Sequence, residues 1–195
     1  MIAIIDYKAG NLASVKKAFD YLGCETQVTD DAAVIARAEK IVLPGVGHFA
    51  ATRALDGAVR AEIDKAIRTG KPFLGICVGM QWMFTGSEES PETPGLCAIA
   101  GACAKFPPTV KSPHVGWNEL KVREDSRLMR GIESGSHVYF THSYRAPMVP
   151  ETVAETAYGA PFSAAVERDN LFGVQFHPEK SGDVGLQMLR NFCEL

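Results

Sequence analysis

The sequence predicts an α/β fold: a doubly wound, mainly parallel sheet flanked by helices, with an added antiparallel portion. Strand-like and helix-like segments alternate over residues 1–85, which is typical of parallel strands joined by right-handed helical crossovers. The second half instead contains short strand-like segments joined by turns, which favours antiparallel pairing. No internal repeat is present, and we expect residues 1–195 to form one domain.

The first half contains four strand-like segments and two helix-like segments. The run MIAII opens the chain as a buried strand, and the four strands are expected at 1–5, 24–29, 40–44 and 71–77. A helix is expected over 12–22, with Asn11 as its N-cap and Gly23 just after its end. A second helix is expected over about 49–69, because this segment is rich in alanine and Gly70 would stop it.

The second half is expected to add strands and one helix. Strand-like segments lie at 114–122, 137–146, 152–158, 162–169 and 171–176. The last segment, 181–195, has a helical pattern. Residues 86–95, GSEESPETPG, are polar and turn-rich, and we interpret them as a surface loop within the domain.

Composition and charge exclude several classes of protein. The chain is 46% hydrophobic and 22% charged with a net charge of −3, so neither disorder nor binding to nucleic acid or an anionic membrane is expected. The five cysteines are odd in number and form no C-x-x-C pair, which argues against a disulfide framework or a zinc site. No secretory leader and no 18-residue apolar stretch is present, so we expect a cytoplasmic protein.

Residues 75–81, GICVGMQ, place a cysteine between two glycines at the end of the fourth expected strand. A helix can begin directly after Cys77, so the cysteine would occupy a tight strand-to-helix turn that lifts its sulfur out of the sheet. The helix N-terminus favours the thiolate, and N–H groups of the turn can hold a developing oxyanion. The pattern predicts a nucleophile. On this motif alone, a buried structural cysteine packed among glycines is the alternative.

A thiolate nucleophile needs a base, and the base needs an orienting acceptor. Among the five histidines, His177 follows the strand expected over 171–176, and Glu179 comes two residues later. The carboxylate can reach one imidazole nitrogen and fix the tautomer, which leaves the other nitrogen for Cys77. Taken alone, the tripeptide HPE could equally be a polar loop end. His48 is a weaker rival base, because no carboxylate adjoins it.

A glycine-rich turn, PGVGHF at 44–49, follows the third expected strand. Sites in parallel α/β sheets form beyond the carboxyl ends of the strands, where this turn and Cys77 would both lie. Backbone N–H groups exposed by glycines suit an oxyanion hole. A plain turn is the alternative interpretation of this stretch.

Six stretches together resemble the class I glutamine amidotransferases, and within them the glutaminase subunits of imidazole glycerol phosphate synthase. They are DYKAGNL (6–12), PGVGHF (44–49), GICVGMQ (75–81), HVGWN (114–118), YFTHSYR (139–145) and GVQFHPEKS (173–181). The family more often has glycine at Lys8 and leucine at Val78, and neither difference touches the expected chemistry. The resemblance implies a mixed central sheet, hydrolysis of glutamine to glutamate and ammonia through a cysteinyl thioester, and no cofactor or metal.

The resemblance also implies a place in histidine biosynthesis and a partner. That partner is a separate (βα)8-barrel cyclase, which receives the ammonia within a heterodimer and makes imidazole glycerol phosphate and aminoimidazole carboxamide ribotide. No phosphate-binding G-x-x-x-x-G-K-[ST] loop occurs here, in keeping with a phosphorylated substrate held by the partner.

The family's functional residues map onto matching positions of this chain. The resemblance implies that Cys77, His177 and Glu179 form a catalytic triad. Glutamine would be held by Gln81, by the backbone of His142, Ser143 and Tyr144, and by Glu89. The oxyanion side would be lined by Gly45, Val46 and Gly47. The positions facing the cyclase would be Asn11, Trp117, Tyr139 and Lys180, although a surface tryptophan could equally serve ordinary packing.

Three other functions compete with this interpretation. One is an amidotransferase subunit for another pathway, such as anthranilate or pyridoxal phosphate synthesis, against which HPEKS and HVGWN argue. Another is a small cysteine hydrolase or stress protein on a related α/β scaffold. The third is a non-catalytic interaction subunit, which the intact set of Cys77, His177 and Glu179 disfavours.

Overall fold

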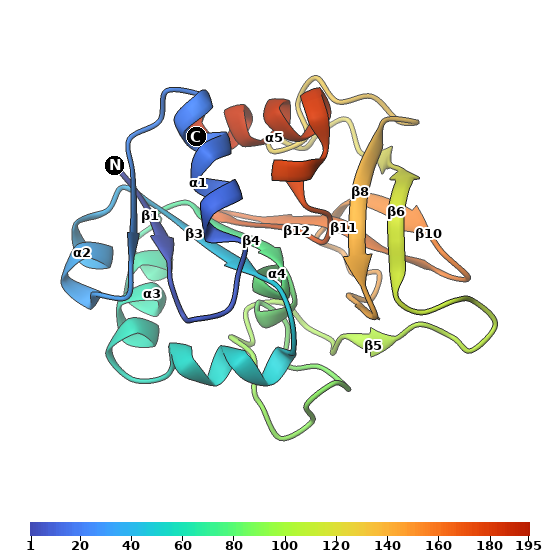
Figure 1. Ribbon diagram of the computed structural model, residues 1–195, viewed down its shortest axis with the longest axis horizontal. Helices are drawn as coiled ribbons and strands as arrows, with labels where there is room; N and C mark the ends of the chain where they lie inside the picture. Colours follow the sequence, from blue (N-terminus) through green and yellow to red (C-terminus); the bar gives the residue numbers. More distant parts are fainter.

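The computed structural model describes residues 1–195, and its centre is an eight-stranded mixed sheet (Figure 1). The strand order is β2-β1-β3-β4-β12-β11-β10-β7. Five neighbouring strands are parallel: β2 (Thr26–Thr29), β1 (Ile2–Ile5), β3 (Lys40–Gly45), β4 (Phe73–Cys77) and β12 (Leu171–Val174). The remaining three are antiparallel: β11 (Pro161–Arg168), β10 (Thr152–Ala157) and β7 (Lys121–Val122). The predicted fold class is confirmed.

Helices cover both faces of the parallel part of the sheet (Figure 1). On one face lie α1 (Leu12–Tyr21) and α5 (Gly182–Glu194), and on the other lie α2 (Ala32–Arg37) and α3 (Ala58–Arg68). Three short helices complete the set: η1 (Phe49–Leu55), α4 (Val78–Trp82) and η2 (Pro178–Lys180). None of these helices has the length and apolar character needed to cross a membrane.

Two small antiparallel sheets stand beside the main one. Strand β6 (His114–Glu119) pairs with β8 (His137–His142), and β5 (Ala104–Lys105) pairs with β9 (Tyr144–Arg145). The β8 strand passes close to η2, which brings this second layer next to the His177–Glu179 segment.

Most elements predicted from the sequence are present, but several predictions are wrong. The segments 114–122 and 137–146 are each divided between two sheets, as β6 and β7 and as β8 and β9, where one strand was expected. The single helix expected over 49–69 is broken into η1 and α3, because Gly57 has a φ of +84° that a continuous helix cannot contain. Asn11 precedes α1 as expected, yet its side chain makes no capping hydrogen bond. The α2 helix was not predicted, although Asp31 caps it by accepting a hydrogen bond from Ala33 N at 2.8 Å.

The turn-rich segment 86–95 is not a simple surface loop. Ser87, Ser90 and Thr93 are 2–4% exposed, and the hydroxyls of Ser90 and Thr93 lie 2.8 Å apart. Because these buried hydroxyls satisfy one another, a polar sequence can fold against the domain body. This packing presents Glu89 to the region above Cys77.

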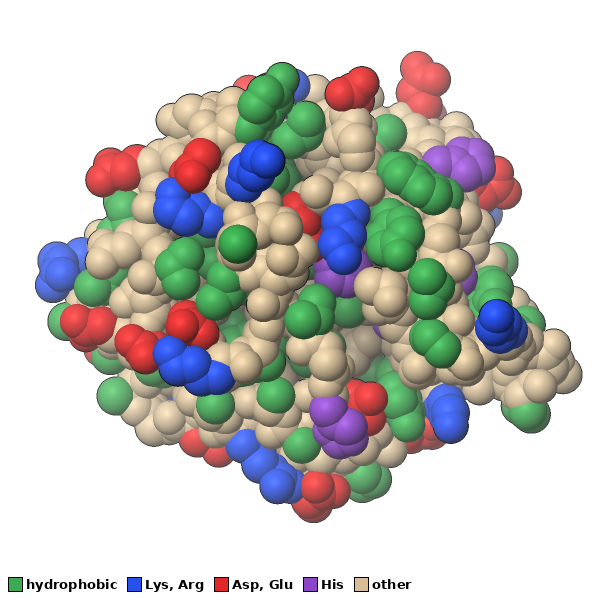
Figure 2. Space-filling view, in the orientation of Figure 1, with side chains coloured by type: hydrophobic (Ala, Val, Ile, Leu, Met, Phe, Trp, Pro, Cys, Tyr) green, Lys and Arg blue, Asp and Glu red, His purple; other side chains and the backbone are tan.

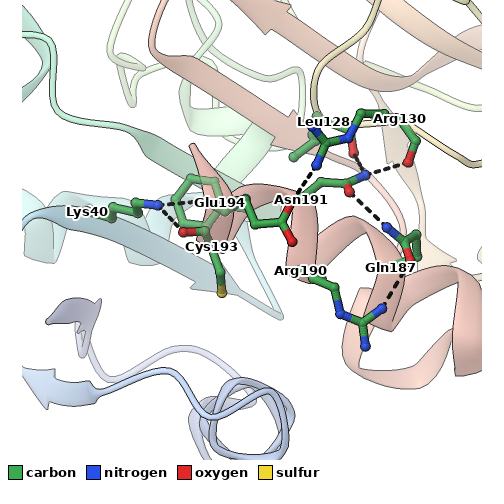
Figure 3. A network of polar contacts seen from close by, with 9 residues as sticks. Lys40, Leu128, Arg130, Gln187, Arg190, Asn191, Cys193 and Glu194 are labelled. Atoms are coloured by element: carbon green, nitrogen blue, oxygen red, sulfur yellow. Dashed lines mark hydrogen bonds and ion pairs between the residues drawn. The ribbon is translucent and has the colours of Figure 1, made fainter.

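Helix α5 is tied to the sheet by polar contacts as well as by its apolar face (Figure 3). Asn191 donates from Nδ2 to the carbonyl oxygens of Leu128 and Arg130, both at 2.8 Å. Lys40 on β3 donates to the carbonyls of Phe192, at 3.1 Å, and Cys193. The Lys40 contacts satisfy carbonyl groups in the last turn of the helix, and the Asn191 contacts tie the helix to residues 128–130. They hold in place the element that follows the His177–Glu179 segment.

Candidate active site

Cys77 occupies a strained turn between β4 and α4. Its φ of 54° and ψ of −108° are rarely adopted by residues other than glycine. A Cβ atom at Gly75 would collide with the carbonyl oxygen of Gly79, and one at Gly79 would collide with the carbonyl of Leu43. Both glycines therefore allow the close approach of backbone that the turn requires. The predicted elbow geometry is present.

His177 comes close to Cys77 because their strands are neighbours. Strand β12 runs parallel to β4 with Val174 opposite Ile76, so both strands deliver their next residues to the same edge. The Nδ1 atom of His177 lies 2.9 Å from Glu179 Oε1, and its Nε2 has no hydrogen-bond partner within the chain. Since Nδ1 faces a carboxylate, it carries the proton, and Nε2 is the nitrogen left for the sulfur.

The electrostatics of this group favour an ion pair. Burial by itself lowers the pKa of His177, but its interactions with Cys77 and with Glu179 outweigh that effect and raise the pKa to about 10. The attraction between imidazolium and thiolate does not need the ideal geometry of a hydrogen bond. The arrangement therefore favours a protonated His177 between Glu179 and Cys77.

Glu179 is buried at the end of this chain of contacts. Its side chain is 1% exposed, and Oε1 also accepts a long hydrogen bond from Asn11 Nδ2 at 3.5 Å. The structure thus places Asn11 beside the carboxylate of Glu179. The position of Asn11 relative to a partner protein stays a prediction.

A cavity of about 140 Å³ opens beside Cys77. Eight of the residues singled out in the sequence line it: Val46, Gly47, Cys77, Gln81, Glu89, His142, Ser143 and Tyr144. Val78 and Thr141 complete the lining. Gly45 is not part of it, because this glycine packs closely against Tyr7, Val78 and Gly79 beneath the cavity.

Two of the lining side chains are held by contacts with other parts of the chain. Glu89 accepts a hydrogen bond at Oε2 from Phe49 N at 2.7 Å, which fixes the loop over the turn at 44–49. Gln81 donates from Nε2 to the carbonyl of Tyr144 at 2.8 Å and to Gln175 Oε1 at 3.1 Å. The amide nitrogen of Gln81 is therefore already engaged within the protein.

Two buried polar groups next to Cys77 were missed in the sequence. Gln175 is fully buried and donates from Nε2 to the Cys77 sulfur at 3.6 Å. The hydroxyl of Tyr7 is buried without a partner, and burial together with the nearby Cys77 raises its pKa. A glutamine inside the apolar run LFGVQF was the only signal that could have indicated Gln175.

An aromatic cluster supports the wall of the cavity formed by β8. His142 donates from Nδ1 to the carbonyl of Tyr144 at 2.9 Å, and its ring lies 5.1 Å from that of Phe106. His114 stacks on Tyr158, with ring centroids 4.1 Å apart. Burial lowers the pKa of His142 to about 3 and that of His114 to about 4, so both rings are neutral at pH 7.

Three predicted partner residues form one contiguous exposed patch, here called the Trp117 patch. Trp117 is 56% exposed and packs edge-on against Tyr139 across the β6–β8 pair, at 6.1 Å between ring centroids. Lys180 lies over the Tyr139 ring at 5.7 Å. Figure 2 shows hydrophobic side chains gathered over the region of β6 and β8. Exposed aromatic surface of this kind is typical of protein–protein contacts.

The sequence profile and the similar proteins described here all indicate the same family. The sequence profile described as "Glutamine amidotransferase class-I" matches residues 3–195. A protein named "Imidazole glycerol phosphate synthase subunit HisH" from Methanothermobacter thermautotrophicus is 47% identical over 196 residues, covering 100% of this chain and 98% of its own. Proteins with the same name from Thermococcus kodakarensis and Syntrophotalea carbinolica are 48% and 46% identical, each covering all of both chains.

Solved structures with distant sequences share the fold. A structure described as a glutamine amidotransferase has a TM-score of 0.79 at 18% identity, covering 100% of this chain and 98% of its own. A structure of PurLQS from Thermotoga maritima has a TM-score of 0.75 at 21% identity, covering 99% of this chain and 97% of that chain.

Proposed function

Because this chain belongs to the class I glutamine amidotransferases, in the branch of the imidazole glycerol phosphate synthase subunit HisH, we propose how its own residues carry out that family's reaction. The chain is a glutaminase that releases ammonia for histidine biosynthesis. Cys77 is the nucleophile, His177 moves the protons, and Glu179 orients His177. Residues 1–195 act together as one amidotransferase domain.

The first half of the reaction forms a thioester. The Cys77 thiolate attacks the side-chain carboxamide carbon of glutamine, and the oxyanion forms against backbone N–H groups of the elbow and of the turn at 44–49. His177, protonated at Nε2, gives its proton to the leaving nitrogen. The C–N bond breaks, ammonia departs, and a γ-glutamyl thioester remains on Cys77.

The second half restores the enzyme. His177, now neutral, takes a proton from water, and the resulting hydroxide adds to the thioester carbonyl. The C–S bond breaks, the sulfur leaves as a thiolate, and glutamate is released. Both halves need an imidazole that can gain and lose a proton at Nε2 while Nδ1–H stays fixed on Glu179, which is the arrangement described above.

Ammonia acts as a nucleophile only while unprotonated, so it is best transferred without contact with bulk water. The HisH relatives are named as subunits of a synthase, and we extend this to a (βα)8-barrel cyclase as partner of this chain. The Trp117 patch, with Asn11 nearby at Glu179, is the surface that we assign to this heterodimer.

The single observation that carries the proposed function is the buried His177–Glu179 pair held next to Cys77. The test is to supply the chain with the cyclase and to measure glutamate release and glutamine-dependent formation of imidazole glycerol phosphate. Barrel partners from anthranilate or pyridoxal phosphate synthesis serve as controls. Coupled turnover with one of those controls, and none with the cyclase, would contradict the assignment.

A further inference from the structure

Gln175 lies directly against the reacting sulfur, although no role had been expected for it. Its side chain is fully buried, and its Nε2 donates to Cys77 Sγ at 3.6 Å, an ordinary distance for a hydrogen bond to sulfur. A buried amide with two donors and one acceptor oxygen needs partners of the right kind on each side. The question is whether the nitrogen, and not the oxygen, faces the sulfur.

The surrounding contacts decide this orientation. The carbonyl oxygen of Tyr144 can only accept, so the group of Gln81 that lies 2.8 Å from it must be the amide nitrogen. That same nitrogen lies 3.1 Å from the side chain of Gln175, so the atom of Gln175 facing it must be the oxygen. The nitrogen of Gln175 is then left pointing at Cys77. The carbonyl of Tyr144 thus fixes the orientation of the Gln81 amide, and the Gln81 amide in turn fixes that of Gln175.

We propose that Gln175 is a further catalytic residue, whose amide N–H donates to the Cys77 sulfur and stabilises the thiolate, and that Gln81 is the positioning residue that orients it. The inference rests on the proposed glutaminase function. A hydrogen bond to an ionised acceptor is about twice as strong as one between neutral groups. The contact therefore favours the thiolate over the thiol and over the thioester.

The same contact serves both halves of the reaction. In the resting enzyme it supplies a hydrogen-bond donor to the sulfur, next to the charge of His177, and both residues belong to the segment that follows β12. During deacylation the C–S bond breaks and the sulfur takes the electron pair. The Gln175 N–H is then already directed at the charge that develops, so no reorganisation is needed at that step.

The test uses the full chain in complex with its cyclase and two substitutions at one position. Gln175→Met keeps the length of the side chain but removes the donor. Gln175→Glu keeps the shape but directs an acceptor oxygen at the sulfur. Gln27→Met, on the exposed side of β2, is the matched control. Glutamate release and the rate of Cys77 alkylation by iodoacetamide are measured from pH 5 to 10.

Loss of the donor should lower kcat for glutamine roughly 10-fold or more with KM little changed, since the contact involves the nucleophile. The pH at which alkylation is half-maximal should rise by about one unit, which corresponds to a tenfold change in the thiolate equilibrium. Gln81→Met, which has no contact with the sulfur, should shift the alkylation profile in the same direction. The control should match the wild type.

If Gln175 had only a structural role, its substitution would change thermal stability but leave the pH profile of Cys77 alkylation unchanged. Superimposable pH profiles for the folded Gln175 variants and the wild type would overturn the proposal. If neither variant folds, the wild-type protein is tested by ¹⁵N NMR. The signal of a buried glutamine side-chain amide should move when Cys77 is alkylated. If no such signal moves, the proposal is overturned. A wild type without glutaminase activity would instead refute the proposed function, because the alkylation profile does not depend on glutamine.

Discussion

The Nδ1 nitrogen of His177 lies 2.9 Å from the Oε1 oxygen of Glu179, and both side chains are 1% exposed. An acceptor at this place holds Nδ1–H in position and leaves Nε2 to exchange protons. Because both side chains are shielded from bulk solvent, their electrostatic interaction is strengthened by the low local dielectric.

The role of Glu179 can be tested by Glu179→Gln. The amide can donate to Nδ1 and so favour the wrong tautomer, and we expect glutaminase kcat to fall by up to about 10⁴, the loss that the equivalent change causes in a serine protease triad. Glu25→Gln, at an exposed position, is the control. Steady-state glutamate release is the measurement, and wild-type kcat in the Glu179 variant would show that the residue does not orient His177.

Cys77 should be the only essential thiol. Cys77→Ser is expected to abolish glutamine hydrolysis, because a serine hydroxyl is not ionised beside His177, while the complex should still use added ammonium salt. A glutamine analogue with an electrophilic side chain should label Cys77 alone, as detected by peptide mass spectrometry. Cys97→Ser, at an exposed cysteine, is the control, and labelling at Cys97 instead of Cys77 would contradict the prediction.

The Trp117 patch should carry much of the affinity for the cyclase. Trp117→Ala is expected to weaken the complex roughly 10-fold or more, since tryptophan is a common hot-spot residue. Calorimetric titration with the cyclase measures this, and Tyr21→Ala removes an aromatic side chain that is 76% exposed on α1 as a control. Equal affinities for the wild type and the Trp117 variant would show that the Trp117 patch is not part of the interface.

Acid should destabilise the protein through its buried neutral histidines. Burial lowers the pKa of His114 to about 4 and that of His142 to about 3, whereas the unfolded chain titrates near 6.5. Below about pH 6.5 the unfolded state therefore binds protons that the folded state does not, and the free energy of unfolding falls as the pH drops toward 4. His177 contributes to the pH dependence of stability with the opposite sign, because its pKa is raised in the folded state. Its stabilising contribution is fully present below about pH 6.5 and is lost as the pH rises toward 10.

His114→Phe isolates the contribution of His114 to the loss of stability in acid, because phenylalanine can still stack on Tyr158 but cannot bind a proton. Urea unfolding at pH 7 and at pH 5 should show a smaller acid-dependent loss of stability in the variant than in the wild type. His137→Phe, at an exposed histidine, should leave the loss unchanged. An identical loss in all three proteins would mean that His114 does not contribute.

The turn at 44–49 offers a place for activation by the partner. Gly45 is packed tightly, but Gly47 has a φ of +97° and open space around it, so a peptide after Gly45 has room to rotate. We expect low glutaminase turnover for the chain alone and roughly 10²–10³-fold higher turnover with the cyclase and its nucleotide substrate, the range for gain of one oxyanion donor. Equal turnover with and without the partner and its ligand would rule out activation by rotation of the peptide after Gly45.

The sequence by itself determined the features that depend on neighbours in the chain. The apolar run 1–5 and the segment 71–77 predicted buried strands, and the glycines around Cys77 predicted the elbow. The spacing of His177 and Glu179 predicted their hydrogen bond, because two residues are enough for the side chains to meet. Such patterns are local, so they can be read without a fold.

Only the tertiary structure decided which distant side chains meet. Gln175 and Cys77 are 98 positions apart, and Gln175 and Gln81 are 94 apart, so their contacts exist only because β12 pairs with β4 in one particular register. The same holds for Glu89, which reaches Phe49 because buried hydroxyls fold the loop 86–95 inward. Strand register and loop packing are set by the burial of the whole core, and no short stretch of sequence contains that information.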